Sequence, residues 1–129
     1  MDVLAELFTR IRNAGKAKHE KLDIPSSKLK AGVAEVLKSF GFIKDFRVVK
    51  VGSKSMMRVY LRYLDSGEHA VTQIRRISRP GLRVYVGSGE IPKVRQGYGF
   101  SILSTNQGII SSKDARDKKL GGELLCQVW

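Results

Sequence analysis

Cysteine and long apolar runs are scarce in this sequence, and each scarcity argues against a class of protein. The 129 residues include one cysteine, Cys126, so no disulfide can form within the chain and a reducing compartment is favoured. No apolar run approaches the about 20 residues that a membrane-spanning helix needs. The first six residues contain two acids and no basic stretch, which is unlike a signal or transit peptide.

Acidic residues are also scarce, with 12 Asp and Glu against 24 Lys and Arg, for a net charge of +12 with neutral histidine. Residues 1–64 hold 14 basic and 6 acidic residues (net +8), and residues 65–129 hold 10 and 6 (net +4). Because the cations are interleaved with apolar positions, folded faces rather than a charged tail should carry the excess. Such an excess attracts polyanions, namely nucleic acid or an anionic membrane surface, and argues against a small-molecule enzyme.

Apolar residues at helical spacing predict two helices in the first half of the chain. The first helix should end at Gly15, and an extended segment over 19–25 should follow it. Ser26 or Ser27 should cap the second helix, which should end with Gly41 in a left-handed conformation. The apolar positions of the two helices are Leu4, Leu7, Phe8, Ile11 and Ala14, then Leu29, Val33, Val36, Leu37 and Phe40.

Basic residues accompany both the helices and the strands of the first half of the chain, which together form an αβαββ pattern. Lys28 and Lys30 should lie beside the apolar stripe of the second helix. A strand over 42–51 and an alternating strand from Met57 to Tyr63 follow, and the second has a basic and aromatic outer face.

The second half of the chain is predicted to be mainly β, with short helices. Strands are expected over 71–77, 82–86, 98–103 and 124–129, a helical turn over 92–96, and a helix over 113–120. The predicted fold class is α+β, with two small α/β domains. The N-terminal αβαββ domain should span 1–64, a linker 65–70, and the mainly β C-terminal domain 71–129.

No pattern in the sequence supports catalysis or metal binding. Gly87-Ser88-Gly89 and Gly97-Tyr98-Gly99 begin like a dinucleotide fingerprint, but each lacks the third glycine and a βαβ context. His19, His69 and Cys126 lack the spacing of zinc ligands, so we interpret the histidines as exposed and the cysteine as a buried small hydrophobe. We predict no catalytic residue, no metal and no cofactor.

Two groups of residues suit RNA binding. An exposed Tyr85 would stack on an unpaired base, although a strand tyrosine packed on the core fits the pattern equally well. Ser104-Thr105-Asn106 is a run of small hydrogen-bonding side chains at the end of a predicted strand. Such a run suits 2′-hydroxyls and base edges, and it also suits an ordinary turn.

Motifs along the whole chain carry a family resemblance. They are Thr9 to Asn13, Ile24 to Lys30, Gly41 to Ile43, Arg76 to Tyr85, Ile91 to Val94, Ile102 to Gly108, Ala115-Arg116, and Gly121 to Trp129. In their order and spacing they resemble bacterial small-subunit ribosomal protein eight, a universal ribosomal protein family.

This resemblance implies a cytoplasmic, non-enzymatic protein of the small ribosomal subunit. Its C-terminal domain would grip an irregular helix in the central domain of small-subunit rRNA, and early binding would support subunit assembly. The residues that the resemblance implies for rRNA binding are Ser104, Thr105, Asn106, Tyr85, Gly121, Gly122, Glu123, Lys28, Lys30 and Arg12. Asn106 stands where serine is usual in the family, so a contact that needs a hydroxyl there is in question.

The implied partners are small-subunit rRNA and neighbouring small-subunit ribosomal proteins, with no membrane and no small-molecule substrate. Family members also bind the mRNA of their own operon as translational repressors. Two other classes stay open on the residues alone. An architectural DNA-binding protein would be equally basic, and an RNA-processing enzyme would need a general base near a metal or paired acids.

Overall fold

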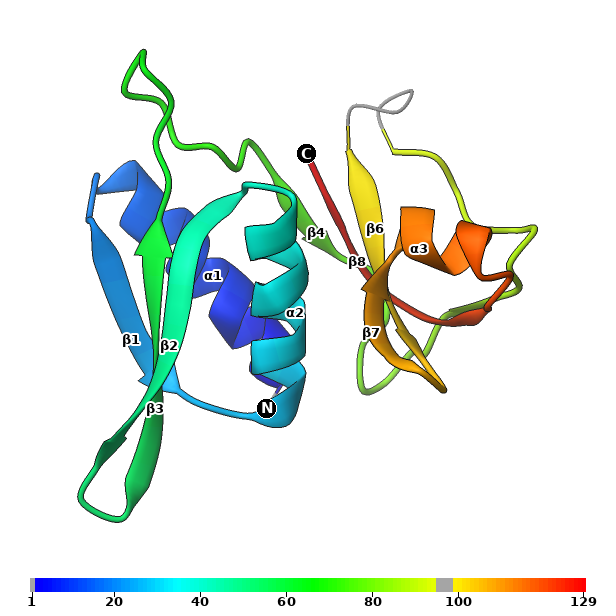
Figure 1. Cartoon of the computed structure of the whole chain (residues 1–129), viewed down its shortest axis with the longest axis horizontal. Helices are drawn as coiled ribbons and strands as arrows, with labels where there is room; N and C mark the ends of the chain where they lie inside the picture. The colour runs from blue at the N-terminus through cyan, green and yellow to red at the C-terminus, as the bar shows by residue number, and fades with distance from the viewer. Residues whose placement is uncertain (1, 95–98) are drawn as a thin grey trace. The chain divides into compact units, whose positions relative to one another are not determined.

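The computed structural model of the chain describes residues 2–94 and 99–129. These residues form two compact units, Val3–Val71 and Thr72–Trp129, and Asp2 groups with the second. Each unit has its own sheet and its own buried apolar residues (Figure 1). The domain limits predicted from the sequence, with a linker over 65–70, stay a prediction.

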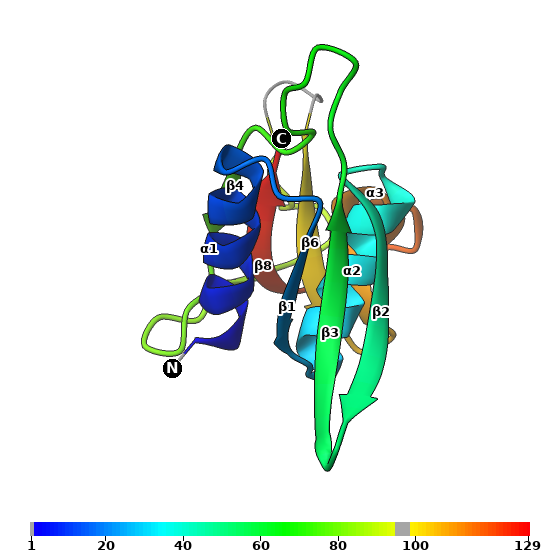
Figure 2. The ribbon, with the colours of Figure 1, turned by 90° about the vertical axis from the view of Figure 1, so that its left-hand side faces the viewer.

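The first unit has the predicted αβαββ order. Its elements are α1 (Val3–Lys16), β1 (Lys21–Pro25), α2 (Lys28–Ser39), β2 (Ile43–Val51) and β3 (Lys54–Leu61). The antiparallel sheet has the order β1-β3-β2, and both helices lie against one face of it (Figures 1 and 2). Because alternate side chains of β1 are buried, namely Leu22 and Ile24, the residues between them face away from the helices.

Local signals fix the ends of α2 as predicted, but the end of α1 differs. The Ser27 hydroxyl accepts a hydrogen bond from the Lys30 N–H at 3.1 Å, and Gly41 has a φ of 76°. The prediction that Gly15 ends the first helix is wrong, because α1 continues through it to Lys16. Gly15 instead permits close packing, since a Cβ there would lie 2.3 Å from Nδ1 of His69.

The prediction that Lys30 lies beside the apolar stripe of α2 is also wrong. Lys30 is only 3% exposed, and its Nζ donates to the Pro25 carbonyl at 2.7 Å and lies 3.9 Å from the Glu6 carboxylate. Position 30 is one helical turn before Val33 and Ala34, which are buried, so the spacing places it on the buried face. The long apolar stem packs there while the ammonium reaches a carbonyl.

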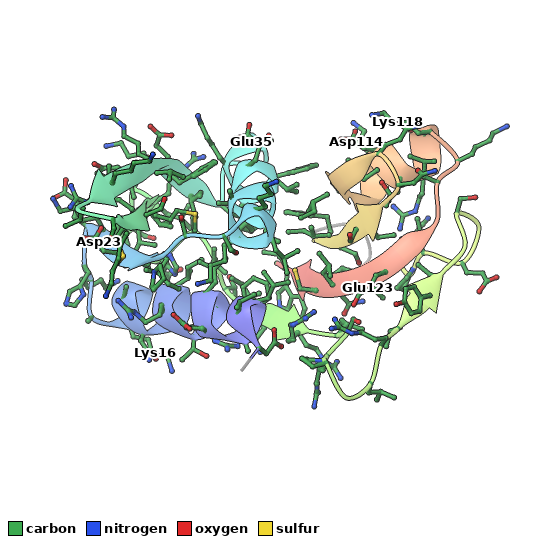
Figure 3. The ribbon with its side chains drawn as sticks, turned by 90° about the horizontal axis from the view of Figure 1, so that it is seen from below. Lys16, Asp23, Glu35, Asp114, Lys118 and Glu123 are labelled. Carbon is green, nitrogen blue, oxygen red and sulfur yellow. The ribbon has the colours of Figure 1, made fainter. Side chains whose placement is uncertain are left out.

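The second unit is mainly β and carries one short helix among its described residues. Its elements are β4 (Ile74–Arg76), β5 (Tyr85–Val86), β6 (Phe100–Thr105), β7 (Gly108–Ser111), α3 (Ser112–Asp117) and β8 (Gly122–Val128). The strands pair in the order β4-β8-β6-β7, and β5 also pairs with β8. The α+β fold class is therefore confirmed. Charged side chains such as Lys16, Glu35 and Lys118 are exposed on the two units (Figure 3).

Strands β4 and β5 are shorter than the ranges predicted for them. Both strands pair with β8, β4 along residues 126–128 and β5 along 122–123. The two segments therefore have the same partner strand, and a turn at Pro80 separates them. The predicted burial of the last strand is confirmed, and Cys126 is fully buried. The predicted helical turn over 92–96 is absent from 92–94, and its last two residues lie outside the described residues.

Candidate nucleic-acid interface

Three neighbouring strands of the second unit place Tyr85, Glu123 and Ser104 in one row. Glu123 on β8 pairs with Tyr85 on β5 on one side and with Ser104 on β6 on the other. Directly opposed residues project from the same face of a sheet, so these three side chains share a face. Tyr85 is 69% exposed, which favours stacking over core packing for its ring. Figure 3 labels Glu123 on its strand.

Gly121 and Gly122 let the backbone of β8 approach its neighbours closely. A Cβ on Gly122 would lie 2.2 Å from the carbonyl oxygen of Ser104, and one on Gly121 would lie 2.6 Å from that of Val86. Because both obstacles are backbone atoms, a side chain here would push the strands apart. The two glycines therefore keep the row of Tyr85, Glu123 and Ser104 together, whether or not they touch RNA themselves.

The turn between β6 and β7 uses one of its polar side chains internally and leaves two available. The Thr105 hydroxyl donates to the Gly108 carbonyl at 2.8 Å and accepts from the Gln107 N–H at 3.1 Å. This confirms the turn. Asn106 is exposed at the turn and Ser104 is partly exposed beside it. Ser104 and Asn106 therefore present hydrogen-bonding groups outward, while Thr105 holds the loop that carries them.

The carboxylate of Glu123 is braced from within the second unit. Its Oε2 accepts hydrogen bonds from the Ser78 hydroxyl and, at 2.9 Å, from Nη1 of Arg83. Ser78 is fully buried, and its oxygen also accepts the Val84 N–H at 3.2 Å. Arg83 places a positive charge beside the carboxylate, which lessens its repulsion toward a phosphate. This arrangement supports a positioning role for Glu123 in the row.

The sequence did not single out Ser78 and Arg83. Ser78 stands 45 residues from Glu123 and was expected only at a turn before Pro80. No local pattern links two residues so far apart, because they meet through the pairing of β8 with the segment after β4, where the Ser78 N–H donates to the Leu124 carbonyl at 3.1 Å. The only sequence signal was a serine and an arginine flanking that turn.

The three predicted cations of the first unit differ in exposure. Lys28 is exposed at the first residue of α2, and Arg12 is partly exposed on α1, with Nη2 at 3.4 Å from Thr9 Oγ1. Lys30 is buried, as described above. Lys28 therefore offers the most accessible charge of the three, and the contact of each with rRNA stays a prediction.

Cysteine and histidine do not form a reactive site in the described residues. Burial raises the pKa of the Cys126 thiol to about 12, so the thiol stays protonated and behaves as a small hydrophobe. His19 is exposed as expected, but the interpretation is wrong for His69, whose Nε2 is buried. Within residues 2–94 and 99–129, no three His, Cys, Asp or Glu side chains gather as metal ligands. No helix in these ranges is long and apolar enough to cross a membrane.

The chain is a strongly basic α+β protein with a tyrosine and small polar side chains on one sheet face. These features are typical of proteins that bind RNA. The chain belongs to the ribosomal protein S8 family, whose profile matches residues 2–129. It is 54% identical over 129 residues to the small ribosomal subunit protein uS8 of Bdellovibrio bacteriovorus, with all of both chains covered. It is 52% identical to uS8 of Geotalea daltonii and 45% identical to uS8 of Streptococcus equi subsp. zooepidemicus. Each of these alignments covers 99% of this chain and 97% of the relative.

Proposed function

We propose that this chain is a structural constituent of the small ribosomal subunit that binds an irregular helix of small-subunit rRNA through its second unit. The observation that carries the proposal is the row formed by Tyr85, Glu123 and Ser104, with Asn106 on the adjoining turn. Tyr85 stacks on an unpaired base, and the small polar groups of Ser104 and Asn106 reach 2′-hydroxyls and base edges. Family membership supports this role, and no catalytic step is part of it.

Two kinds of contact divide the work of binding. The net charge of +12 collects the RNA and displaces counterions, so affinity falls as salt rises. Exposed cations such as Lys28 contribute to this electrostatic attraction, which depends little on the base sequence of the RNA. The uncharged row supplies discrimination, because it reads the shape of an irregular helix where a regular A-form major groove is too narrow for side chains.

The proposal places the protein on the ribosome, in the cytoplasm of a bacterium, with neighbouring small-subunit proteins as further partners. Early binding holds the rRNA in a shape that later proteins need. Binding to the mRNA of its own operon would make it a translational repressor as well. A gel shift with the leader transcript of that operon tests this role, and the absence of a specific shift would exclude it.

The central test compares two variants on two RNAs. Ser104→Ala should weaken binding to the central-domain rRNA helix by about 1–2 kcal/mol, and binding to random RNA should stay nearly unchanged. Tyr85→Leu should cost about 1–3 kcal/mol on the same helix without lowering stability, because the ring is exposed. Ser53→Ala, an exposed serine in the first unit, serves as the control.

The same assay separates RNA from DNA recognition. At fixed salt, duplex DNA should compete poorly with the rRNA helix, because 2′-hydroxyl contacts favour RNA. Equal losses on both RNAs with Ser104→Ala would contradict the proposed division between charge and shape recognition. Equal competition by DNA would favour an architectural DNA-binding protein instead.

A further inference from the structure

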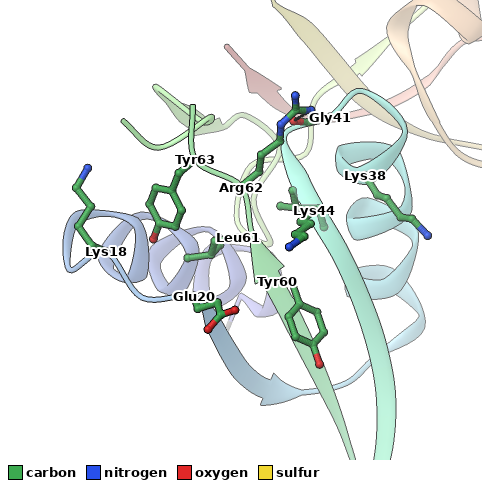
Figure 4. Close-up of a pocket in the computed structure, with 10 residues that line it drawn as sticks. Lys18, Glu20, Lys38, Gly41, Lys44, Tyr60, Leu61, Arg62 and Tyr63 are labelled. Carbon is green, nitrogen blue, oxygen red and sulfur yellow. Dashed lines mark hydrogen bonds between the residues drawn. The ribbon is translucent and has the colours of Figure 1, made fainter. Parts of the chain in front are cut away.

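A broad hollow of about 660 Å³ opens in the first unit, away from every residue assigned above. Four cations line it, Lys18, Lys38, Lys44 and Arg62, against one carboxylate, Glu20. Its walls also include Leu61 and the rings of Tyr60 and Tyr63 (Figure 4). A concave site of this volume, with apolar and aromatic walls and a few polar groups, is of the size that small ligands occupy.

A β-bulge delivers Lys44 to this hollow. The pairing of β2 with β3 runs from Ile43 opposite Leu61 to Asp45 opposite Tyr60, so Lys44 is an extra residue without a partner in the ladder. A bulge of this kind re-aims a side chain, and bulges are over-represented beside functional sites. Lys44 is exposed and forms no ion pair with the described residues. Figure 4 shows it in the hollow, close to Leu61 and Tyr60.

Arg62 and Lys18 keep their positive charges uncompensated at the rim. Nη1 of Arg62 donates to the carbonyl of Gly41 at 3.0 Å, and Nζ of Lys18 donates to that of Gly67. A carbonyl carries no net charge, so both cations still attract an anion. The bond from Arg62 also offsets the negative end of α2, which would otherwise repel a phosphate there.

Lys38 contributes less than the other cations. Its Nζ lies 3.2 Å from Asp45, and in Figure 4 the side chain points away from the hollow. Glu20 is the one acid in the lining. The hollow therefore keeps a positive excess, with Lys44 inside it and Arg62 directed toward Gly41 at its edge.

We propose that this hollow binds one unpaired nucleotide of RNA, with the phosphate on Lys44 and the base against the ring of Tyr60, while Arg62 adds positive charge at the edge. This proposal rests on the proposed function and adds a nucleotide-binding site to the charge contacts of the first unit. Tyr60 is partly exposed, and the guanidinium carbon of Arg47 lies 6.0 Å from its ring centre. A base stacked on Tyr60 therefore lies close to a further cation.

The aromatic walls favour a nucleotide over an acidic peptide. An acidic peptide would be attracted by the same cations, but it has no planar group that requires Tyr60. A base gains stacking contact with that ring as well as charge neutralisation of its phosphate. Loss of the ring should therefore weaken the binding of a nucleotide and leave the binding of an acidic peptide unchanged.

The test follows backbone amide signals of the full chain by NMR during titration with uridine 5′-monophosphate at low salt. Signals of Gly41, Lys44 and Tyr60 should shift, and uridine or inorganic phosphate alone should bind at least about threefold more weakly, because each supplies only half of the interaction. Hexaglutamate serves as the acidic-peptide probe. Phosphate shifts equal to those of the nucleotide, or tighter binding of hexaglutamate, would overturn the assignment.

Matched variants locate the effect. Lys44→Gln should weaken nucleotide binding at least about threefold. Lys50 is an exposed lysine on the same strand, and Lys50→Gln should change nucleotide binding little because it removes the same charge outside the hollow. Tyr60→Leu should weaken the nucleotide but not hexaglutamate, and the same spectra show whether the variant is folded. If it does not fold, the comparison of Lys44 with Lys50 decides.

Failure of this inference is distinct from failure of the proposed function. If the wild-type protein binds the rRNA helix through Tyr85 and Ser104 while Lys44→Gln and Lys50→Gln behave alike toward the nucleotide, only the hollow is excluded. If the wild-type protein does not bind the rRNA helix, the proposed function is wrong whatever the nucleotide titration shows.

Discussion

The hydroxyl of Ser78 donates a hydrogen bond to Oε2 of Glu123, although 45 residues separate the two in the sequence. Ser78 is fully buried, and Glu123 lies between Tyr85 and Ser104 in the proposed RNA-binding row. The buried serine therefore fixes the orientation of a side chain at the surface. This link connects the packing of the second unit with the face that we propose for RNA.

Removal of this link should cost stability. Ser78→Ala should lower the free energy of unfolding by about 1–2 kcal/mol, because it leaves the Val84 N–H without its acceptor and one bond to Glu123 unmade. Chemical denaturation measures the change. Ser53→Ala, at an exposed turn, should stay within about 0.5 kcal/mol of the wild type, and an equally small effect of Ser78→Ala would contradict the bracing role.

Lys28 and Lys30 should respond differently to the same substitution. Lys28→Ala removes an exposed cation, so it should weaken binding to specific and random RNA alike. The slope of log affinity against log salt concentration should become shallower by about 1, with little change in stability. Lys30→Ala should instead lower the free energy of unfolding by about 1–3 kcal/mol, because it breaks the buried bond to Pro25. Binding across a salt series and chemical denaturation separate the two effects, and full stability of Lys30→Ala would contradict the buried position.

Gly15→Ala should destabilise the protein although alanine favours a helix by about 1 kcal/mol. The new Cβ would lie 2.3 Å from Nδ1 of His69 and within 2.8 Å of two further ring atoms. We expect a net loss of about 1–3 kcal/mol, since the ring must move. In the background of His69→Ala the same substitution should be neutral or stabilising, and a double-mutant cycle by thermal unfolding measures this coupling.

The stability of the protein should depend on pH through His69. Burial, and then the charge of Lys18, lower the pKa of His69 below its ordinary 6.5. The folded state therefore disfavours the protonated ring. The stabilisation is present above about pH 6.5 and is lost as the pH falls through the lowered pKa.

Denaturation at about pH 7.5 and about pH 5 should therefore show a smaller free energy of unfolding at the lower pH. The decrease should be smaller in His69→Gln, which cannot titrate in this range. His19→Gln, at an exposed position, should retain it. The same decrease in the wild type and His69→Gln would show that other groups cause the pH dependence.

The order of elements in the first unit and the ends of α2 could be predicted from the amino-acid sequence alone. Apolar spacing predicted both helices of the first unit, and the capping serine and the left-handed glycine were readable because they depend on neighbours only a few residues away. The turn at Ser104-Thr105-Asn106 was readable for the same reason. Family motifs then gave the expected role, because they extend along the whole chain.

Features that depend on contacts between distant segments could not be predicted and became visible only in the folded chain. Lys30 joined the buried face because Pro25 and Glu6 receive its ammonium. Gly15, inside α1, leaves the space into which the distant His69 packs. The register of β8 with β5 and β6 placed Glu123 between Tyr85 and Ser104. The pairing of β8 with the segment after β4 gave Glu123 its partner Ser78. Strand register follows from the packing of whole sheets, so no local run of residues encodes it.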